Sequence, residues 1–210
     1  MRADSIAFAL SGILFGVIVG WILGTQQTAG VAATAAPAAA AAPATAGGDG
    51  ARPPAAPLDE NRAKELVAAA SGAPADPAPR VELGNLYFDA ERYPEAVEWY
   101  EQALRIKPDD ANVSTDLGVA YYYTDQPDKA IQQFEQSLKV DPKHTKTMLN
   151  MGIVKAFGKQ DLAGAAAAWQ QVIATAPDSP EATAAKKALE GLQQAHPGGP
   201  AAGASGTPGS

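Results

Sequence analysis

A repeat with a period of 34 residues constrains the fold of this chain more than any other feature. Each unit of the repeat holds a glycine preceded by Leu or Met and, later, a proline. These residues are Leu83, Gly84 and Pro108, then Leu117, Gly118 and Pro142, then Met151, Gly152 and Pro177. A fixed period of this length predicts similar supersecondary units stacked side by side.

Inside each unit the apolar residues follow a helical spacing. In the first unit they are Leu83, Leu86 and Tyr87, followed by Ala96, Trp99, Tyr100 and Ala103. Residues three or four positions apart share one face of an α-helix. The short polar stretches DAERYP, TDQPDK and GKQDLAG separate the two halves of the units. Each unit is therefore predicted to be a helix, a turn and a second helix.

The first two units, residues 81–108 and 115–142, resemble the tetratricopeptide repeat. The family pattern is L-G-x2-Y, then A-x3-F, then P. The first unit matches it with Leu83, Gly84, Tyr87, Ala96, Tyr100, Ala103 and Pro108, and the second with Leu117, Gly118, Tyr121, Ala130, Phe134, Ser137 and Pro142. A third unit is in phase through Met151, Gly152, Ala165, Trp169, Val172 and Pro177. It has Lys155 in place of the first aromatic residue and one extra residue in its turn.

The resemblance implies an all-α solenoid of eight helices. We expect a domain over residues 59–195, with repeats at about 77–110, 111–144 and 145–178 and flanking helices at 59–72 and 179–195. In this arrangement Gly and Ala let paired helices approach, and the aromatic residue four positions after the Ala fills the gap between neighbouring units. The flanking helices cap the stack, whose outer faces meet water.

In the tetratricopeptide family the first helices of the units line a concave groove that holds peptides or helices. The resemblance places in this groove Asn85, Phe88, Val119, Tyr122, Tyr123, Lys146, Leu149, Asn150, Ile153 and Phe157. This set is rich in aromatic and branched side chains, which suits an amphipathic helix or an apolar peptide. The alternative for Phe88 and Tyr122 is a place in the core between helices.

A variant of this groove clamps a C-terminal carboxylate with a Lys/Asn/Lys/Arg set. Asn85 and Lys146 match that set. The other positions hold Val81, Asp116 and Asn150, so the sequence argues against carboxylate clamping.

The N-terminal region predicts a membrane helix. Residues 5–24 hold no charged side chain, and 20 residues of α-helix span about 30 Å, the thickness of the hydrocarbon core. A cleaved signal peptide is the alternative, with Val31-Ala32-Ala33 as a small-residue site. The apolar run is longer than a signal peptide needs, and only Arg2 precedes it as a positive charge, so we expect a retained anchor.

Four glycines lie on one stripe of that predicted helix, at Gly12, Gly16, Gly20 and Gly24. Such a stripe lets a second helix approach closely, and so predicts self-association through the anchor. A plain anchor with tolerated glycines is the alternative.

The anchor predicts a single-pass protein of the cytoplasmic (inner) membrane. Arg2 favours a cytoplasmic N-terminus at residues 1–4, with the domain outside the cytoplasm, periplasmic in a bacterium of that type. Residues 25–58 are almost entirely Ala, Pro, Gly and Thr, which predicts a flexible linker, and residues 196–210 predict a disordered tail.

The composition argues against catalysis and nucleic-acid binding. The chain has no cysteine, and its two histidines, His144 and His196, lack neighbours at metal-ligand spacing. Residues 59–195 hold 21 acidic and 14 basic side chains, which is the wrong sign for phosphate. We therefore expect no enzyme activity, no cofactor, no metal and no nucleic-acid partner, but a protein or peptide ligand.

Three functions fit these features. The layout of anchor, spacer and repeats resembles the bacterial cytochrome c-type biogenesis proteins, whose exported repeats hold unfolded apocytochrome. A scaffold for envelope machinery, such as secretion, pilus or cell-wall assembly, fits equally well. An inverted anchor would instead give a tethered adaptor that faces the cytoplasm.

Overall fold

The structure is a computed structural model that describes residues 56–197. Within this range it holds eight α-helices and no strand, which confirms the predicted all-α architecture. The helices are α2 (Glu60–Gly72), α3 (Ala78–Asp89), α4 (Tyr93–Ile106), α5 (Ala111–Tyr123), α6 (Pro127–Val140), α7 (Thr145–Ile153), α8 (Leu162–Thr175) and α9 (Pro180–Ala195). A π-helical turn, η1 (Val154–Gly158), continues α7.

The membrane segment predicted at 5–24, with its glycines Gly12, Gly16, Gly20 and Gly24, lies outside the described residues. So do the linker up to residue 55 and the tail from residue 198. Between residues 56 and 197, no helix has the length and apolar character needed to cross a bilayer.

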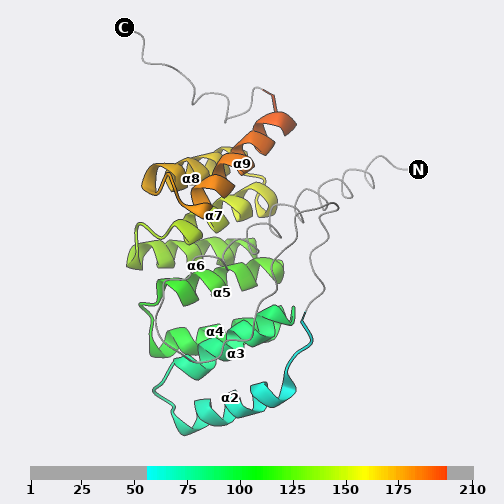
Figure 1. Ribbon diagram of the computed structural model, residues 1–210, viewed down its shortest axis with the longest axis vertical. Helices are drawn as coiled ribbons and strands as arrows, with labels where there is room; N and C mark the ends of the chain where they lie inside the picture. The colour runs from blue at the N-terminus through cyan, green and yellow to red at the C-terminus, as the bar shows by residue number, and fades with distance from the viewer. Residues whose placement is uncertain (1–55, 198–210) are drawn as a thin grey trace, which may run out of the picture. The chain divides into compact units, whose positions relative to one another are not determined.

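The helices stack in chain order, as Figure 1 shows. The pairs α3–α4, α5–α6 and α7–α8 pack as three helical hairpins, and contacts of α4 with α5 and of α6 with α7 join one hairpin to the next. Helix α2 packs on α3, and α9 packs on α8. Each hairpin corresponds to one 34-residue unit of the sequence.

Side-chain caps and prolines set the ends of the helices. The carboxylate of Asp59 accepts hydrogen bonds from the backbone N–H groups of Asn61 and Arg62, and Asp110, Asp161 and Ser179 cap α5, α8 and α9 in the same way. Such caps satisfy N–H groups that have no partner inside the helix. The repeated prolines follow the helix ends, where they stop the helix from continuing.

The repeated glycines bring the two helices of a unit into contact. A Cβ atom added to Gly84 would lie 2.4 Å from the Tyr100 ring, and one added to Gly118 would lie 2.4 Å from the Phe134 ring. In the third unit the Trp169 indole covers Gly152 in the same way. The repeated aromatic residue therefore packs on the glycine of its own unit. The Tyr100 and Phe134 rings also belong to one core cluster with residues of both the first and the second unit, such as Ala96 and Leu117.

The extra residue of the third unit lies in the π-helical turn and not in the connection between helices, where the sequence had placed it. One residue per turn has a positive φ angle, namely Glu91, Asp125 and Gln160. The first two lie seven residues after the repeated glycine, and Gln160 lies eight residues after it. Since η1 absorbs the additional residue, the third hairpin keeps the turn geometry of the others.

Candidate functional site

The candidate site is the surface of α3, α5 and α7 that carries the predicted groove residues, called here the first-helix surface. Its main feature is an aromatic cluster formed by Phe88, Tyr93, Tyr122 and Tyr123. The Tyr93 and Tyr123 rings stack with centroids 4.5 Å apart, and Phe88 meets both edge-on at 5.2 and 5.8 Å. The Tyr122 ring centroid lies 6.0 Å from that of Tyr123. The cluster joins the first unit to the second, and all four side chains are half-buried.

The two residues that match the carboxylate-clamp set have partners inside the domain. Tyr100 donates a hydrogen bond to the side-chain oxygen of Asn85 at 2.7 Å. Burial raises the pKa of Tyr100, so this hydroxyl remains a donor. The ammonium of Lys146 forms a half-buried ion pair with Asp116 at 2.8 Å. Both predicted clamp groups are therefore satisfied by neighbours on adjacent helices.

The structure places the remaining groove residues in two groups. Val119, Asn150 and Phe157 are half-buried, and Phe157 belongs to η1. Leu149 and Ile153 are only 1% and 4% exposed, which corrects the expectation that they line an open surface. They belong to the buried side of α7, where Trp169 donates a hydrogen bond to the Leu149 carbonyl.

Tyr122 packs between units, as the alternative interpretation expected. A Cβ atom added to Gly158 would lie 3.1 Å from the Tyr122 ring and 2.9 Å from Pro127. Burial, with a smaller contribution from Asp125, raises the pKa of Tyr122 to about 12. Phe88 also packs against the core around Leu117 and Phe134, so both aromatic residues contribute to stability as well as to the surface.

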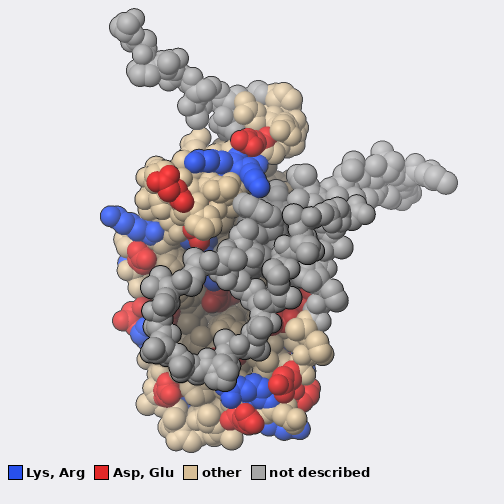
Figure 2. All heavy atoms as spheres, viewed as in Figure 1, with Lys and Arg blue, Asp and Glu red and all other residues tan. Residues whose placement is uncertain are grey.

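Charges of both signs are interspersed on the face of the described domain that Figure 2 shows. Several are paired, including Arg62 with Glu82 at 2.6 Å and Lys159 with Asp128 at 2.6 Å.

A buried hydroxyl network joins the second and third units. Thr147 of α7 lies 2.5 Å from Thr115 of α5 and 2.8 Å from Ser137 of α6 (oxygen to oxygen). Ser137 donates to the backbone carbonyl of Ala111 at 2.9 Å, which leaves the Thr115 hydroxyl to donate to the Thr147 oxygen. Thr115, Ser137 and Thr147 are each 0% exposed, so these hydrogen bonds replace water completely. The network fixes α7 against both helices of the second unit.

His144, just before α7, extends this network to the surface. Its Nε2 lies 3.0 Å from the side-chain oxygen of Asn112, which can only accept, so Nε2 carries the proton. Its Nδ1, 2.6 Å from the Thr147 oxygen, then accepts the hydroxyl proton of Thr147. The neutral imidazole therefore satisfies both neighbours.

We expect acid to weaken the domain through His144. Burial lowers the pKa of this histidine below its ordinary value of 6.5, and Lys146 adds to the effect, whereas Asp141, Asp116 and Glu181 oppose it. The stabilisation from the neutral ring is therefore complete above about pH 6.5, the unfolded value, and is lost as the pH falls through the folded pKa. Urea unfolding at about pH 7.5 and about pH 5, each for the native chain and His144→Gln, measures this effect.

The native chain should lose more unfolding free energy between the two pH values than the variant loses. The difference will be modest because the ring is partly solvated. An identical loss in both proteins would show that His144 does not titrate with folding.

Sequence reasoning missed Tyr93 and the hydroxyl network. Tyr93 is the first residue of α4, where α6 begins with Pro127 and α8 with Leu162, so the repeat gave no sign of it. The hydroxyl residues Thr115 and Thr147 are 32 residues apart and do not follow the 34-residue register. The only sequence signal for the network is that these hydroxyl residues stand at positions where the helical pattern is otherwise apolar.

Comparison with known proteins identifies the repeats. Residues 84–125 match a sequence profile described as TPR repeat, and residues 111–144 match one described as tetratricopeptide repeat. These matches cover the first and second units. A comparison with curated proteins finds no match.

Solved structures show the same fold. The Sgt2 TPR domain from Aspergillus fumigatus is 26% identical, with a TM-score of 0.53 over 64% of this chain and 86% of that one. The first TPR of Spaghetti (RPAP3) bound to the HSP90 peptide SRMEEVD is 22% identical, with a TM-score of 0.50 over 66% and 95%. MamA is 18% identical, with a TM-score of 0.55 over 61% and 75%.

Proposed function

We propose that this chain is a membrane-tethered assembly factor that holds apolar polypeptide segments. The chain carries tetratricopeptide repeats and is a protein–protein interaction module. The aromatic cluster of the first-helix surface carries this proposal. Phe88, Tyr93 and Tyr123 offer ring surface from two units at one place. An apolar side chain that is fully covered there gains about 1.5–3 kcal/mol.

The polar groups of the first-helix surface support the same ligand class. Asn85 is bound to Tyr100, and Lys146 is paired with Asp116. A ligand carboxylate would have to displace Asp116 from Lys146, and leaving Asp116 half-buried without its cation costs free energy. An apolar helix or extended segment makes no such demand.

The sequence supplies the remaining support for the tether. The uncharged residues 5–24 would anchor the chain in the membrane, with the repeats outside the cytoplasm. The Ala/Pro-rich stretch that follows would serve as a flexible linker between the anchor and the repeats. A holding protein for unfolded apocytochrome in cytochrome c-type biogenesis fits this layout, because an unfolded chain presents apolar segments before its cofactor is attached.

The test is the affinity of the full chain for an amphipathic helical peptide, prepared with a free C-terminal carboxylate and with an amide. We expect the two forms to bind within about twofold of each other, since no clamp reads the terminus. Replacing the apolar residues of the peptide with Ser and Asn should weaken binding by about tenfold or more, equivalent to about 1.4 kcal/mol. A loss of about tenfold on amidation would instead show that the site is a carboxylate clamp.

A further inference from the structure

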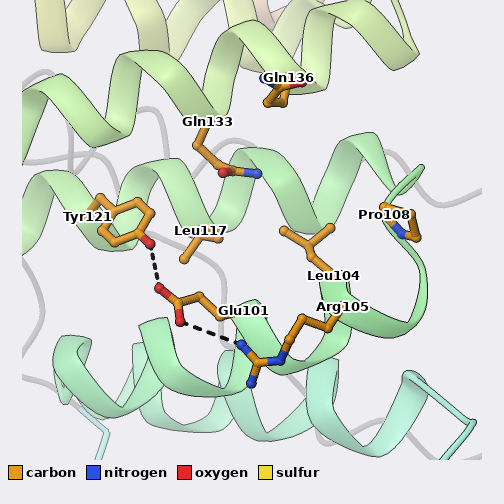
Figure 3. Close-up of a pocket in the computed structure, with 8 residues that line it drawn as sticks. All are labelled: Glu101, Leu104, Arg105, Pro108, Leu117, Tyr121, Gln133 and Gln136. Atoms are coloured by element: carbon orange, nitrogen blue, oxygen red, sulfur yellow. Dashed lines mark hydrogen bonds and ion pairs between the residues drawn. The ribbon is translucent and has the colours of Figure 1, made fainter.

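A pocket lies between α4 and α6, the second helices of the first two units. It has a volume of about 380 Å³, and α5 forms its floor (Figure 3). Leu104 and Pro108 line it from the first unit, Leu117 from α5, and Gln133 from α6. None of these residues belongs to the first-helix surface.

The chain itself contains a template for what fills such a position. Gln133 is 34 residues after Trp99, so the two occupy equivalent places in successive units. Trp99 packs its indole against the cluster of Ala63, Leu66 and Leu83, where α2 and α3 meet α4. An indole therefore covers the junction before the first unit, whereas an amide stands at the junction between the first and second units.

The position of Gln133 leaves that second junction open. Its amide nitrogen donates to the Ser114 hydroxyl at 2.6 Å, and Ser114 donates back to the Gln133 backbone carbonyl at 3.1 Å. These bonds hold the side chain against α5. Figure 3 shows Leu104 and Leu117 beside it at the base of the pocket.

The rim of the pocket carries a carboxylate and a guanidinium. The Glu101 carboxylate accepts a hydrogen bond from the Tyr121 hydroxyl at 2.5 Å through Oε1. Its Oε2 lies 3.8 Å from the Arg105 Nη1, a long ion pair, and the Arg105 side chain is 66% exposed. One carboxylate oxygen is thus only weakly engaged, and the mostly exposed guanidinium stands at the edge of the pocket.

We propose that this pocket binds a tryptophan side chain presented by a partner polypeptide. The indole ring would cover Leu104, Leu117 and Pro108, as Trp99 covers the preceding junction. Its N–H would donate to Oε2 of Glu101, since indole has one donor and no acceptor. Arg105 would lie over the ring face, and tryptophan is the side chain that cations favour most. This site is independent of the proposed function of the first-helix surface.

N-acetyl-tryptophanamide is the probe, and methyl NMR of the full chain with labelled leucines is the measurement. We expect saturable shifts of the Leu104 and Leu117 methyl signals in the native chain. Gln133→Trp should abolish them, because its own indole fills the pocket as Trp99 fills its equivalent. Gln132→Trp, at an exposed neighbouring position of α6, should bind like the native chain.

Arg105→Gln gives a second test, the affinity for the probe, which does not depend on filling the pocket with another side chain. Loss of the cation over the ring should weaken binding of the probe about threefold. The proposal is overturned if the native chain shows no shift up to the solubility limit of the probe, if Gln133→Trp shifts like the native chain, or if Arg105→Gln binds with unchanged affinity.

Discussion

Gly118→Ala is expected to lower the free energy of unfolding by about 2 kcal/mol or more, although alanine is the better helix former. The new Cβ would lie 2.4 Å from one carbon of the Phe134 ring and 2.7 Å from a second. Phe134 is 0% exposed, so the ring lies wholly inside the core and a shift would push it against its buried neighbours. The intrinsic preference of about 1 kcal/mol for Ala over Gly in a helix offsets only part of this overpacking. Chemical denaturation measures the net change.

Gly191→Ala is the matched control for this substitution. Gly191 is also inside a helix, α9, but a Cβ there would meet no atom within 4 Å. The control should therefore stabilise the chain by about 0.5–1 kcal/mol. Phe134→Leu should cost less when combined with Gly118→Ala than in the native chain, because the smaller side chain relieves the clash. A stabilising Gly118→Ala would contradict the described packing of this unit.

The features that could be predicted from the sequence are those that recur in every unit. Gly118 and Phe134 serve the same contact as Gly84 and Tyr100, so a single constraint appears at a fixed spacing and becomes visible without any structure. Such a contact is local, because both residues lie within one helical hairpin. The helix count and order follow from the same register.

The features that could not be predicted occur once. Tyr93 completes the aromatic cluster from the start of α4, and only the packing of two units brings it to Tyr123. Leu149 and Ile153 hold family groove positions, yet the fit of α7 against its neighbours buries them. The extra residue near Gly158 could enter a turn or a π-helical turn, and the sequence does not distinguish the two. Each of these features occurs in one unit or at one junction, so the 34-residue repeat does not reveal it.

The aromatic cluster also determines how the site can be tested. Tyr123 stacks on Tyr93 and meets Phe88, so a charge placed at Tyr123 would disturb the core as well as the surface. An aromatic photo-reactive residue in place of Phe88 keeps a ring in the cluster and reports directly on what touches it. Gln132 on α6 is exposed and lies outside the cluster, so the same photo-reactive residue placed there is the control.

The central claim is that an apolar polypeptide binds at this cluster, and photo-cross-linking of the amphipathic peptide to the full chain tests it most directly. We expect the cross-linked yield from position 88 to exceed that from position 132 by about tenfold, the ratio of occupancies for a site about 1.4 kcal/mol more favourable. Excess unlabelled peptide should remove the product. Equal yields at the two positions, or a larger yield at position 132, would contradict the account and place the binding surface elsewhere.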